Sequence, residues 1–198
     1  MHRKNIEDKA RIMVDKILVD KKVHPLACEI KLYDKELYKH SLNVAFITAQ
    51  IVSQLDFVKS KKYDFVIAAF LHDVGKIKIP IELIKKEGQL CPEEYILIKS
   101  HVDEGVKILK EAGFNDLIIR CVATHHEALD GSGYPKGLDK SSLTNEDRLI
   151  AAVDKYDALT SKRSYGIEYA SYEAIGVLIH EGNVDTECLK FINACEAI

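Results

Sequence analysis

The chain has no tryptophan, only four prolines, no excess of positive charge and no long apolar run. A formal net charge of −3 over 198 residues argues against the basic surface that binds polymeric nucleic acid. The longest apolar stretch, Phe65 to Leu71, falls well short of the roughly 18 residues of a membrane span. The N-terminus mixes charges and lacks the apolar segment of a secretory signal. We therefore expect a cytoplasmic protein without a membrane or nucleic-acid partner.

Cysteines are few and scattered, at positions 28, 91, 121, 188 and 195, and none forms a CxxC pair. An odd number without paired spacing argues against a disulfide framework and against a cysteine zinc site. We expect reduced thiols that are buried or incidental, as free cysteines usually are.

Strand-like alternation is also almost absent, and Lys76 to Ile79 is too short to count as a strand. Apolar residues instead recur at helical spacing. The pattern predicts helices over residues 6–18, 34–55, 63–72, 92–112, 115–126, 145–159, 171–180 and 185–197. The main irregular region, residues 129–144, holds several glycines and serines, and loops of this length are usually functional or disordered. The fold class is all-α, with a helical extension over residues 1–30 and one compact multi-helix domain over 31–198.

Five local groups of metal-ligand side chains follow one another along the chain. They are Glu36 with His40, His72 with Asp73, His101, His125 with His126, and Asp154. Imidazoles and carboxylates together suit iron, manganese, zinc and similar ions. Each residue alone also has a structural explanation, and His2, His24 and His180 lack comparable neighbours.

The spacing gives a physical reason to group these residues. Glu36 and His40 are four apart and share one face of a helix. His72 and Asp73 lie where an apolar helix runs into a glycine, so both side chains can turn into one cavity. His125 and His126 diverge by about 100° on a regular helix, which favours a multi-metal cluster or a distorted helix end. Asp154 lies on a small, apolar face, where a buried carboxylate needs a partner such as a cation.

A resemblance to a known family is carried by these residues. His40, His72–Asp73 and Asp154 resemble the H…HD…D signature of the HD phosphohydrolase superfamily. The run from His125 to Pro135 matches the HHExxDGxGYP signature of the HD-GYP subgroup at all eight specified positions. Residues 72–76, Lys99–His101 and 156–161 match further family motifs, and the resemblance extends from about residue 35 to the C-terminus. It implies an HD-type domain with a metal cluster in its helical core.

The resemblance also implies a role for each ligand. His40, His72, Asp73 and Asp154 resemble ligands of a first metal, and His101, His125 and His126 resemble those of a second, with Asp73 as the bridge. Glu36 resembles the branch of the family that holds a third metal, although a solvated helical glutamate is the alternative. Two or three divalent ions, iron or manganese, are expected.

Further residues resemble family positions that contact substrate. Lys76 matches a phosphate-binding lysine, and with Asp73 it forms the predicted catalytic pair. Arg163 resembles an arginine on substrate phosphate, with a structural salt bridge almost as plausible, and Tyr134 either contacts substrate or packs its loop. Glu127 and Asp130 are expected to brace the loop rather than to catalyse. Residues 131–137 resemble a loop that contacts protein partners, and a homodimer is left open.

The implied reaction is hydrolysis of cyclic di-GMP to pGpG by a metal-bridging hydroxide, with further cleavage to GMP left open. Two departures from the pattern bear on the substrate. The family's RPYR is Arg163-Ser164-Tyr165-Gly166 here, and its HSxRV is 40–44 with Asn43 in place of the arginine. All expected metal ligands remain, but two arginines are missing. The alternative substrates are therefore cyclic GMP-AMP or another phosphoester. The alternative to an enzyme is a non-catalytic scaffold that signals through the loop.

Overall fold

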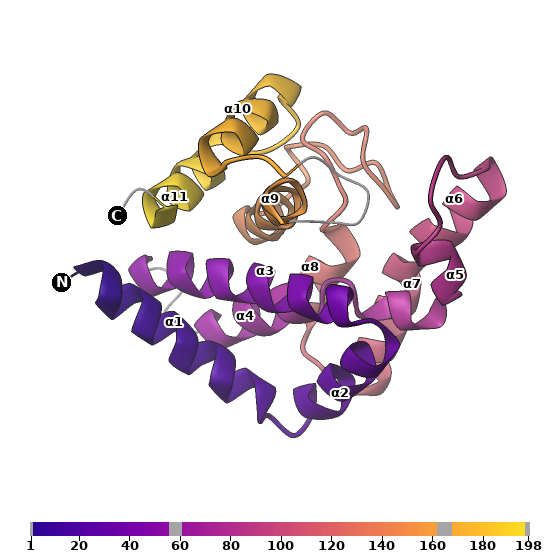
Figure 1. Cartoon of the computed structure of the whole chain (residues 1–198), viewed down its shortest axis with the longest axis horizontal. Helices are drawn as coiled ribbons and strands as arrows, with labels where there is room; N and C mark the ends of the chain where they lie inside the picture. The colour runs from indigo at the N-terminus through magenta and orange to yellow at the C-terminus, as the bar shows by residue number, and fades with distance from the viewer. Residues whose placement is uncertain (1, 56–60, 162–167, 197–198) are drawn as a thin grey trace.

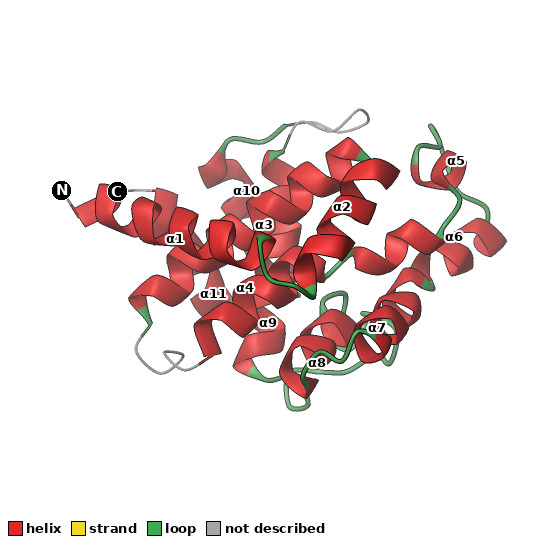
Figure 2. Cartoon of the chain, turned by 90° about the horizontal axis from the view of Figure 1, so that it is seen from below, coloured by secondary structure: helices red, strands yellow, loops and turns green. Residues whose placement is uncertain are grey.

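The chain folds into helices joined by loops, as Figure 2 shows. The structure is a computed structural model that describes residues 2–55, 61–161 and 168–196. Within these ranges no strand forms, apart from an isolated bridge between Asp130 and Asp139, so the predicted all-α class is confirmed. The elements are α1 His2–Leu18, α2 Val23–Tyr33, α3 Lys35–Gln54, α4 Lys62–Leu71, the 3-10 helix η2 Val74–Lys78, α5 Ile81–Ile84, α6 Pro92–Lys99, α7 His101–Glu111, α8 Asp116–Thr124, α9 Asn145–Thr160, α10 Ser171–Glu181 and α11 Thr186–Glu196.

Helices α3 and α4 lie at the centre of the molecule (Figure 1). Helix α3 packs against α1, α2, α4, α9 and α11. Helix α4 is apolar on nearly all sides, and its residues from Phe65 to Leu71 are buried apart from the half-buried Ile67. A helix that is hydrophobic all round belongs in a core. The C-terminal end of α4 consequently places the next residue, His72, in the interior.

Local capping explains where several helices begin. The Asn115 side chain accepts a hydrogen bond from the Ile118 N–H and so caps the N-terminus of α8. Thr144 and Asp147 form a reciprocal capping box at the start of α9. Such caps satisfy amide groups that have no partner within the helix.

The prediction of one helix over residues 92–112 is wrong, because the chain breaks at Ser100 into α6 and α7. The Ser100 hydroxyl donates a hydrogen bond of 2.7 Å to the Leu97 carbonyl. A serine that bonds its own helix backbone competes with the regular ladder of hydrogen bonds. The break lets His101 begin a new helix with its side chain fully buried.

Helix α2 and the short elements η2 and α5 were not predicted from the sequence. The signal for α2 was present, because Val23, Leu26, Ala27 and Ile30 follow helical spacing and are all buried. Pro25 falls in the first turn of α2, where a missing amide N–H costs no hydrogen bond.

Helix α1 packs on α3 and α4 (Figure 1), and its residues Ala10, Met13, Val14 and Ile17 belong to the same apolar core. The division of the chain at residue 30 stays a prediction. In the described part of the chain, no helix combines the length and the apolar character that crossing a membrane requires.

Candidate metal centre

Five histidines and two aspartates meet in the interior, although they come from segments far apart in the sequence. His40 lies on α3 and Asp154 on α9. His72 and Asp73 follow the end of α4, His101 opens α7, and His125 and His126 follow the end of α8. All are buried except His126, whose side chain is 22% exposed. The sequence prediction grouped these seven residues, and the structure brings all of them together.

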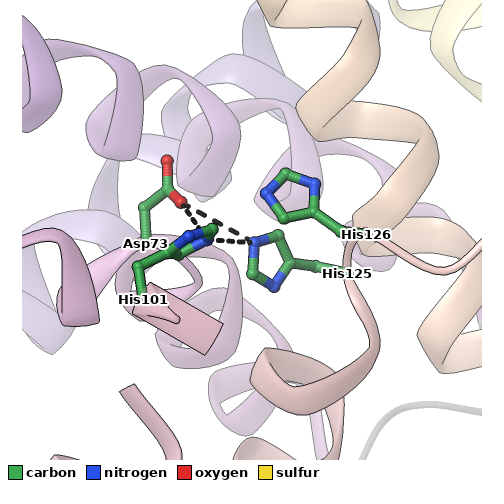
Figure 3. Close-up of side chains that lie close together, drawn as sticks. All are labelled: Asp73, His101, His125 and His126. Carbon is green, nitrogen blue, oxygen red and sulfur yellow. Dashed lines mark hydrogen bonds and ion pairs between the residues drawn. The ribbon is translucent and has the colours of Figure 1, made fainter. Parts of the chain in front are cut away.

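Asp73 lies between two sets of histidines and turns one carboxylate oxygen toward each. Its Oδ1 is 3.2 Å from His101 Nε2 and 3.7 Å from His125 Nε2 (Figure 3). Its Oδ2 is 3.3 Å from His72 Nε2 and 3.8 Å from His40 Nε2. One carboxylate thus contributes to both sets, which is the geometry of a bridging ligand.

The first set consists of His40, His72, Asp73 and Asp154. His40 Nε2 is 3.2 Å from His72 Nε2. Asp154 Oδ1 is 3.0 Å from His40 Nε2 and 3.5 Å from His72 Nε2. Four potential ligand atoms from three helical segments therefore face one another.

The second set consists of Asp73, His101, His125 and His126, whose ligand atoms all lie within 4.8 Å of one another. His101 Nε2 is 3.4 Å from His125 Nε2, and Figure 3 shows the rings directed toward the Asp73 carboxylate. The regular helix ends at Thr124, and His125 is its C-cap with dihedral angles still in the right-handed helical region. The ring centroids of His125 and His126 are 4.0 Å apart, which agrees with the expected distortion of the helix end.

Main-chain carbonyls hold three of these imidazoles in place. The Nδ1 atoms of His72, His101 and His125 lie 2.6–2.7 Å from the carbonyl oxygens of Ala69, Ile98 and Val122, each three residues earlier. Because a carbonyl only accepts, each Nδ1 carries a proton, and each Nε2 is the nitrogen left to bind a metal. An outer hydrogen bond of this kind orients a metal-ligating histidine and fixes its tautomer.

His40 is oriented instead by Asp157, a residue for which the sequence reading assigned no role. His40 Nδ1 lies 2.6 Å from Asp157 Oδ2, and the Asp157 side chain is buried. The signal was available, because Asp154 and Asp157 are three apart and share one face of α9.

Burial and the carboxylates pull the pKa values of the histidines in opposite directions. Burial lowers the pKa of His72, but Asp73 and Asp154 outweigh it and raise the pKa to about 10. Burial and the neighbouring His125 lower the pKa of His126 to about 2. Burial raises the pKa of Asp73, yet Lys76 and His72 hold it well below its usual range. At neutral pH, His126 is therefore neutral and Asp73 is ionised, which are the forms that bind metals, whereas a metal would displace the second proton that Asp73 and Asp154 keep on His72.

The residues fit divalent cations. Asp73 Oδ1 is buried and has no hydrogen-bond partner among the described residues, a costly state that a cation would relieve. The Nε2 atoms of His40 and His72 face each other at 3.2 Å, as those of His101 and His125 do at 3.4 Å. Two lone pairs at such a distance repel unless a proton or a metal lies between them. A set of imidazoles and carboxylates suits iron, manganese or zinc.

Three other predicted site residues have different positions. Lys76 Nζ pairs with Asp73 Oδ2 at 2.5 Å, so it reaches the cluster. Glu36 is exposed on α3, one turn before His40, and belongs to neither set. Arg163, together with residues 164–166 of the altered motif, lies outside the described residues.

The loop over residues 129–144 folds back over the second set. Its brace is Glu127, whose buried carboxylate accepts hydrogen bonds of 2.8 Å from the Lys136 and Leu138 amides. Gly133 is pressed against the backbone of residues 126–128, where an added Cβ would lie 2.4 Å from the Ala128 nitrogen. The Tyr134 ring consequently lies on His126, with centroids 4.7 Å apart.

The bracing roles predicted for Glu127 and Asp130 agree with these contacts. Asp130 accepts hydrogen bonds from the amide and the hydroxyl of Ser132. A protein partner for residues 131–137 and a homodimer stay predictions.

Comparison with known proteins places this geometry in context. A family model described as HD domain matches residues 16–187. A cyclic di-GMP phosphodiesterase of Thermotoga maritima is 35% identical over 67% of this chain and 36% of its own length. The 3'3'-cGAMP-specific phosphodiesterase 1 of Vibrio cholerae is 29% identical over 78% of this chain and 37% of its own.

Among solved structures, the HDG"Y"P protein Bd1817 of Bdellovibrio bacteriovorus aligns with a TM-score of 0.70 at 22% identity, over 99% of this chain and 64% of that one. This likeness shows the fold. The resemblance drawn from the sequence motifs is confirmed, and the chain spans less than half the length of the two curated relatives described.

Proposed function

Because the chain belongs to the HD domain family, we propose that it is a metal-dependent phosphodiesterase that hydrolyses cyclic di-GMP to pGpG. One observation carries this proposal above the others. The Asp73 carboxylate presents one oxygen to each of two histidine sets, and its Oδ1 has no other partner in the described part of the chain. A buried carboxylate that joins two sets of ligands is suited to a two-metal site, and such sites act on phosphoesters.

The proposal assigns the ligands by set. His40, His72 and Asp154 would hold the first ion, and His101, His125 and His126 the second, with Asp73 shared. Glu36 is proposed to serve a third ion, supported by its position one turn before His40 on α3. The family and the donor set support metal dependence, and we propose iron or manganese as the ions.

When bound, divalent ions supply an activated water at neutral pH and neutralise charge on the phosphate. The chain's own residues do the rest. Asp157 and the carbonyls of Ala69, Ile98 and Val122 bind the Nδ1 atoms of four histidines and so direct each Nε2 inward. The Lys76 ammonium, 20% exposed beside Asp73, is placed to donate to a non-bridging phosphate oxygen.

The substrate assignment is supported by the names of the relatives. The Thermotoga maritima relative is named for cyclic di-GMP, and the Vibrio cholerae relative for 3'3'-cGAMP. Both are cyclic dinucleotides that contain guanine. Cyclic GMP-AMP is the second candidate substrate, because two arginines of the family pattern are absent from residues 40–44 and 163–166. Tyr134, stacked on His126, and Arg163 are proposed to contact the substrate.

The test compares metal content and turnover in one anaerobically prepared sample of the wild type, Asp73→Ala and Asp103→Ala. Asp103 is an exposed aspartate on α7 and serves as the matched control. We expect two to three ions per chain and release of pGpG or GMP in the wild type and the control, with both lost in Asp73→Ala. Circular dichroism checks that the variant keeps its helices.

Either failure has a definite meaning. Metal without turnover of any cyclic dinucleotide would replace the substrate with another phosphoester. If the wild type binds no metal after incubation with an excess of iron or manganese, the proposal is overturned.

A further inference from the structure

A lysine and two tyrosines form a stack at the edge of the metal centre. Lys99 Nζ lies 4.3 Å from the ring centroid of Tyr95 and 4.6 Å from that of Tyr134. Tyr134 in turn lies on His126, a residue of the second histidine set. The order of contacts is therefore Tyr95, Lys99, Tyr134, His126, from the surface to the proposed metals. We call Tyr95, Lys99 and Tyr134 the rim stack.

The rim stack is built from two separate segments. Tyr95 and Lys99 are four residues apart on α6 and so share one face of that helix. Tyr134 comes from the loop that Glu127 braces. Helix α6 lies at the end of the molecule away from both termini (Figure 1). The stack thus links the edge of the molecule to its catalytic interior.

The charge of Lys99 has no anionic partner among the described contacts, since no carboxylate pairs with it there. Its ammonium has three N–H donors and, within the described ranges, faces the two rings alone. Lys86, by contrast, pairs with Glu94 on the same helix, and Lys76 pairs with Asp73. A half-buried cation with unused donors beside a site for an anionic substrate is available to bind that substrate.

Tyr95 offers the second part of a binding site. Its side chain is exposed at 48%, and the group that covers its ring face is the flexible Lys99 side chain. Stacking of a nucleobase on an aromatic ring contributes about 1–3 kcal/mol by alanine substitution and tolerates any base. A lysine beside the base can distinguish guanine, whose O6 and N7 both accept, from adenine, which presents an N6 donor.

We propose that Tyr95 and Lys99 form the subsite for one guanine base of a cyclic dinucleotide. The base would stack on the Tyr95 face that Lys99 now covers, and the flexible Lys99 side chain would move to the edge of the base and donate to its O6 and N7. This inference rests on the proposed function and adds to it the residues that select the base. It also offers a cation for recognition in a chain that lacks two arginines of the family pattern.

The experiment measures kcat and KM for cyclic di-GMP and cyclic di-AMP in metal-loaded wild type, Lys99→Met and Lys99→Arg. Loss of a two-point contact to guanine is expected to lower kcat/KM for cyclic di-GMP by about 10- to 100-fold, mainly through KM. Cyclic di-AMP should change little, so the preference for guanine collapses. Arginine at position 99 can still donate to both acceptors and should restore the preference.

Two further substitutions separate stacking from base selection. Tyr95→Ala should weaken the use of both dinucleotides about equally, by about tenfold, whereas Tyr95→Phe should retain both. Lys107, an exposed lysine on α7, supplies the control Lys107→Met, which should behave as the wild type. Metal content is measured for every variant.

The outcomes are distinct. An unchanged guanine preference in Lys99→Met overturns the inference, and so does a parallel loss of metal, which would make Lys99 a structural residue. If the wild type turns over neither dinucleotide, calorimetry on the metal-loaded protein decides. Guanine-selective binding that Lys99→Met abolishes would support the subsite while overturning only the reaction, and no binding at all would overturn both.

Discussion

Removing the Asp157 carboxylate is expected to lower the affinity for one metal ion and to leave the affinity for the other unchanged. Asp157 Oδ2 lies 2.6 Å from His40 Nδ1, and its Oδ1 accepts a hydrogen bond of 2.8 Å from Ser161. Partners of this kind change metal affinity by about 10- to 100-fold, which is about 1.4–2.7 kcal/mol of binding free energy. Asp157→Ala should show the full loss, and the buried His40 N–H left without a partner adds a cost of about 1–3 kcal/mol to folding.

Two variants sharpen this prediction. Asp157→Asn keeps an acceptor of the same shape but loses the charge, and charged hydrogen bonds are about twice as strong as neutral ones. Its affinity should therefore fall between those of the wild type and Asp157→Ala. Ser161→Ala removes the other contact of Asp157 and leaves the His40 contact in place, so it is the matched control.

The assay is competition for metal against a chelator of known affinity, fitted to separate sites. Only the affinity of the site that includes His40 should fall, because Asp157 contacts His40 and is not among the ligands of the second set. Equal affinities in the wild type and Asp157→Ala would refute the reasoning. Equal weakening of both ions would show instead that Asp157 supports the whole fold.

Two further predictions concern packing. Gly75→Ala should lower the melting temperature and the metal content, because its Cβ would lie within 2.5 Å of the Gly105 nitrogen and nearer still to the His101 carbonyl. Gly176→Ala on α10, where a Cβ meets nothing within 4 Å, is the control and should stabilise the protein by up to about 1 kcal/mol. A thiol reagent should label only Cys28 and Cys91 in the native protein; burial raises the pKa of Cys188 to about 12, and labelling of the buried cysteines before unfolding would contradict the packing.

Much of the fold was accessible from the sequence because helical periodicity is a local signal. The core helix α4 ends within one residue of its predicted limit, and α8 begins within one residue of its own. The break at Ser100 was missed because apolar spacing continues across it from Ile98 to Val102. A serine hydroxyl that bonds its own helix is a matter of side-chain conformation, which periodicity does not record.

The metal centre could be predicted as a set of residues but not as a geometry. The motifs named the seven residues that meet, while the allocation of one Asp73 oxygen to each set required coordinates. Asp157 shows a different limit. Its spacing from Asp154 was visible in the sequence, but its contact with His40 joins α9 to α3 across the core.

The positions of the histidines follow from an elementary property of helices. The last carbonyls of an α-helix have no partner within it, and the C-terminal end carries partial negative charge. Helices α4, α6 and α8 all end at the cluster of histidines, and each gives a carbonyl of its last turn to a histidine Nδ1.

The same atoms thus fix the tautomer of three ligands and direct three negative helix ends toward the place where cations are proposed to bind. A histidine immediately after an apolar helix is therefore a stronger candidate for a metal ligand than a histidine within a helix. In this chain the criterion separates His72 and His125 from His24 and His180, which lie within helices and are exposed.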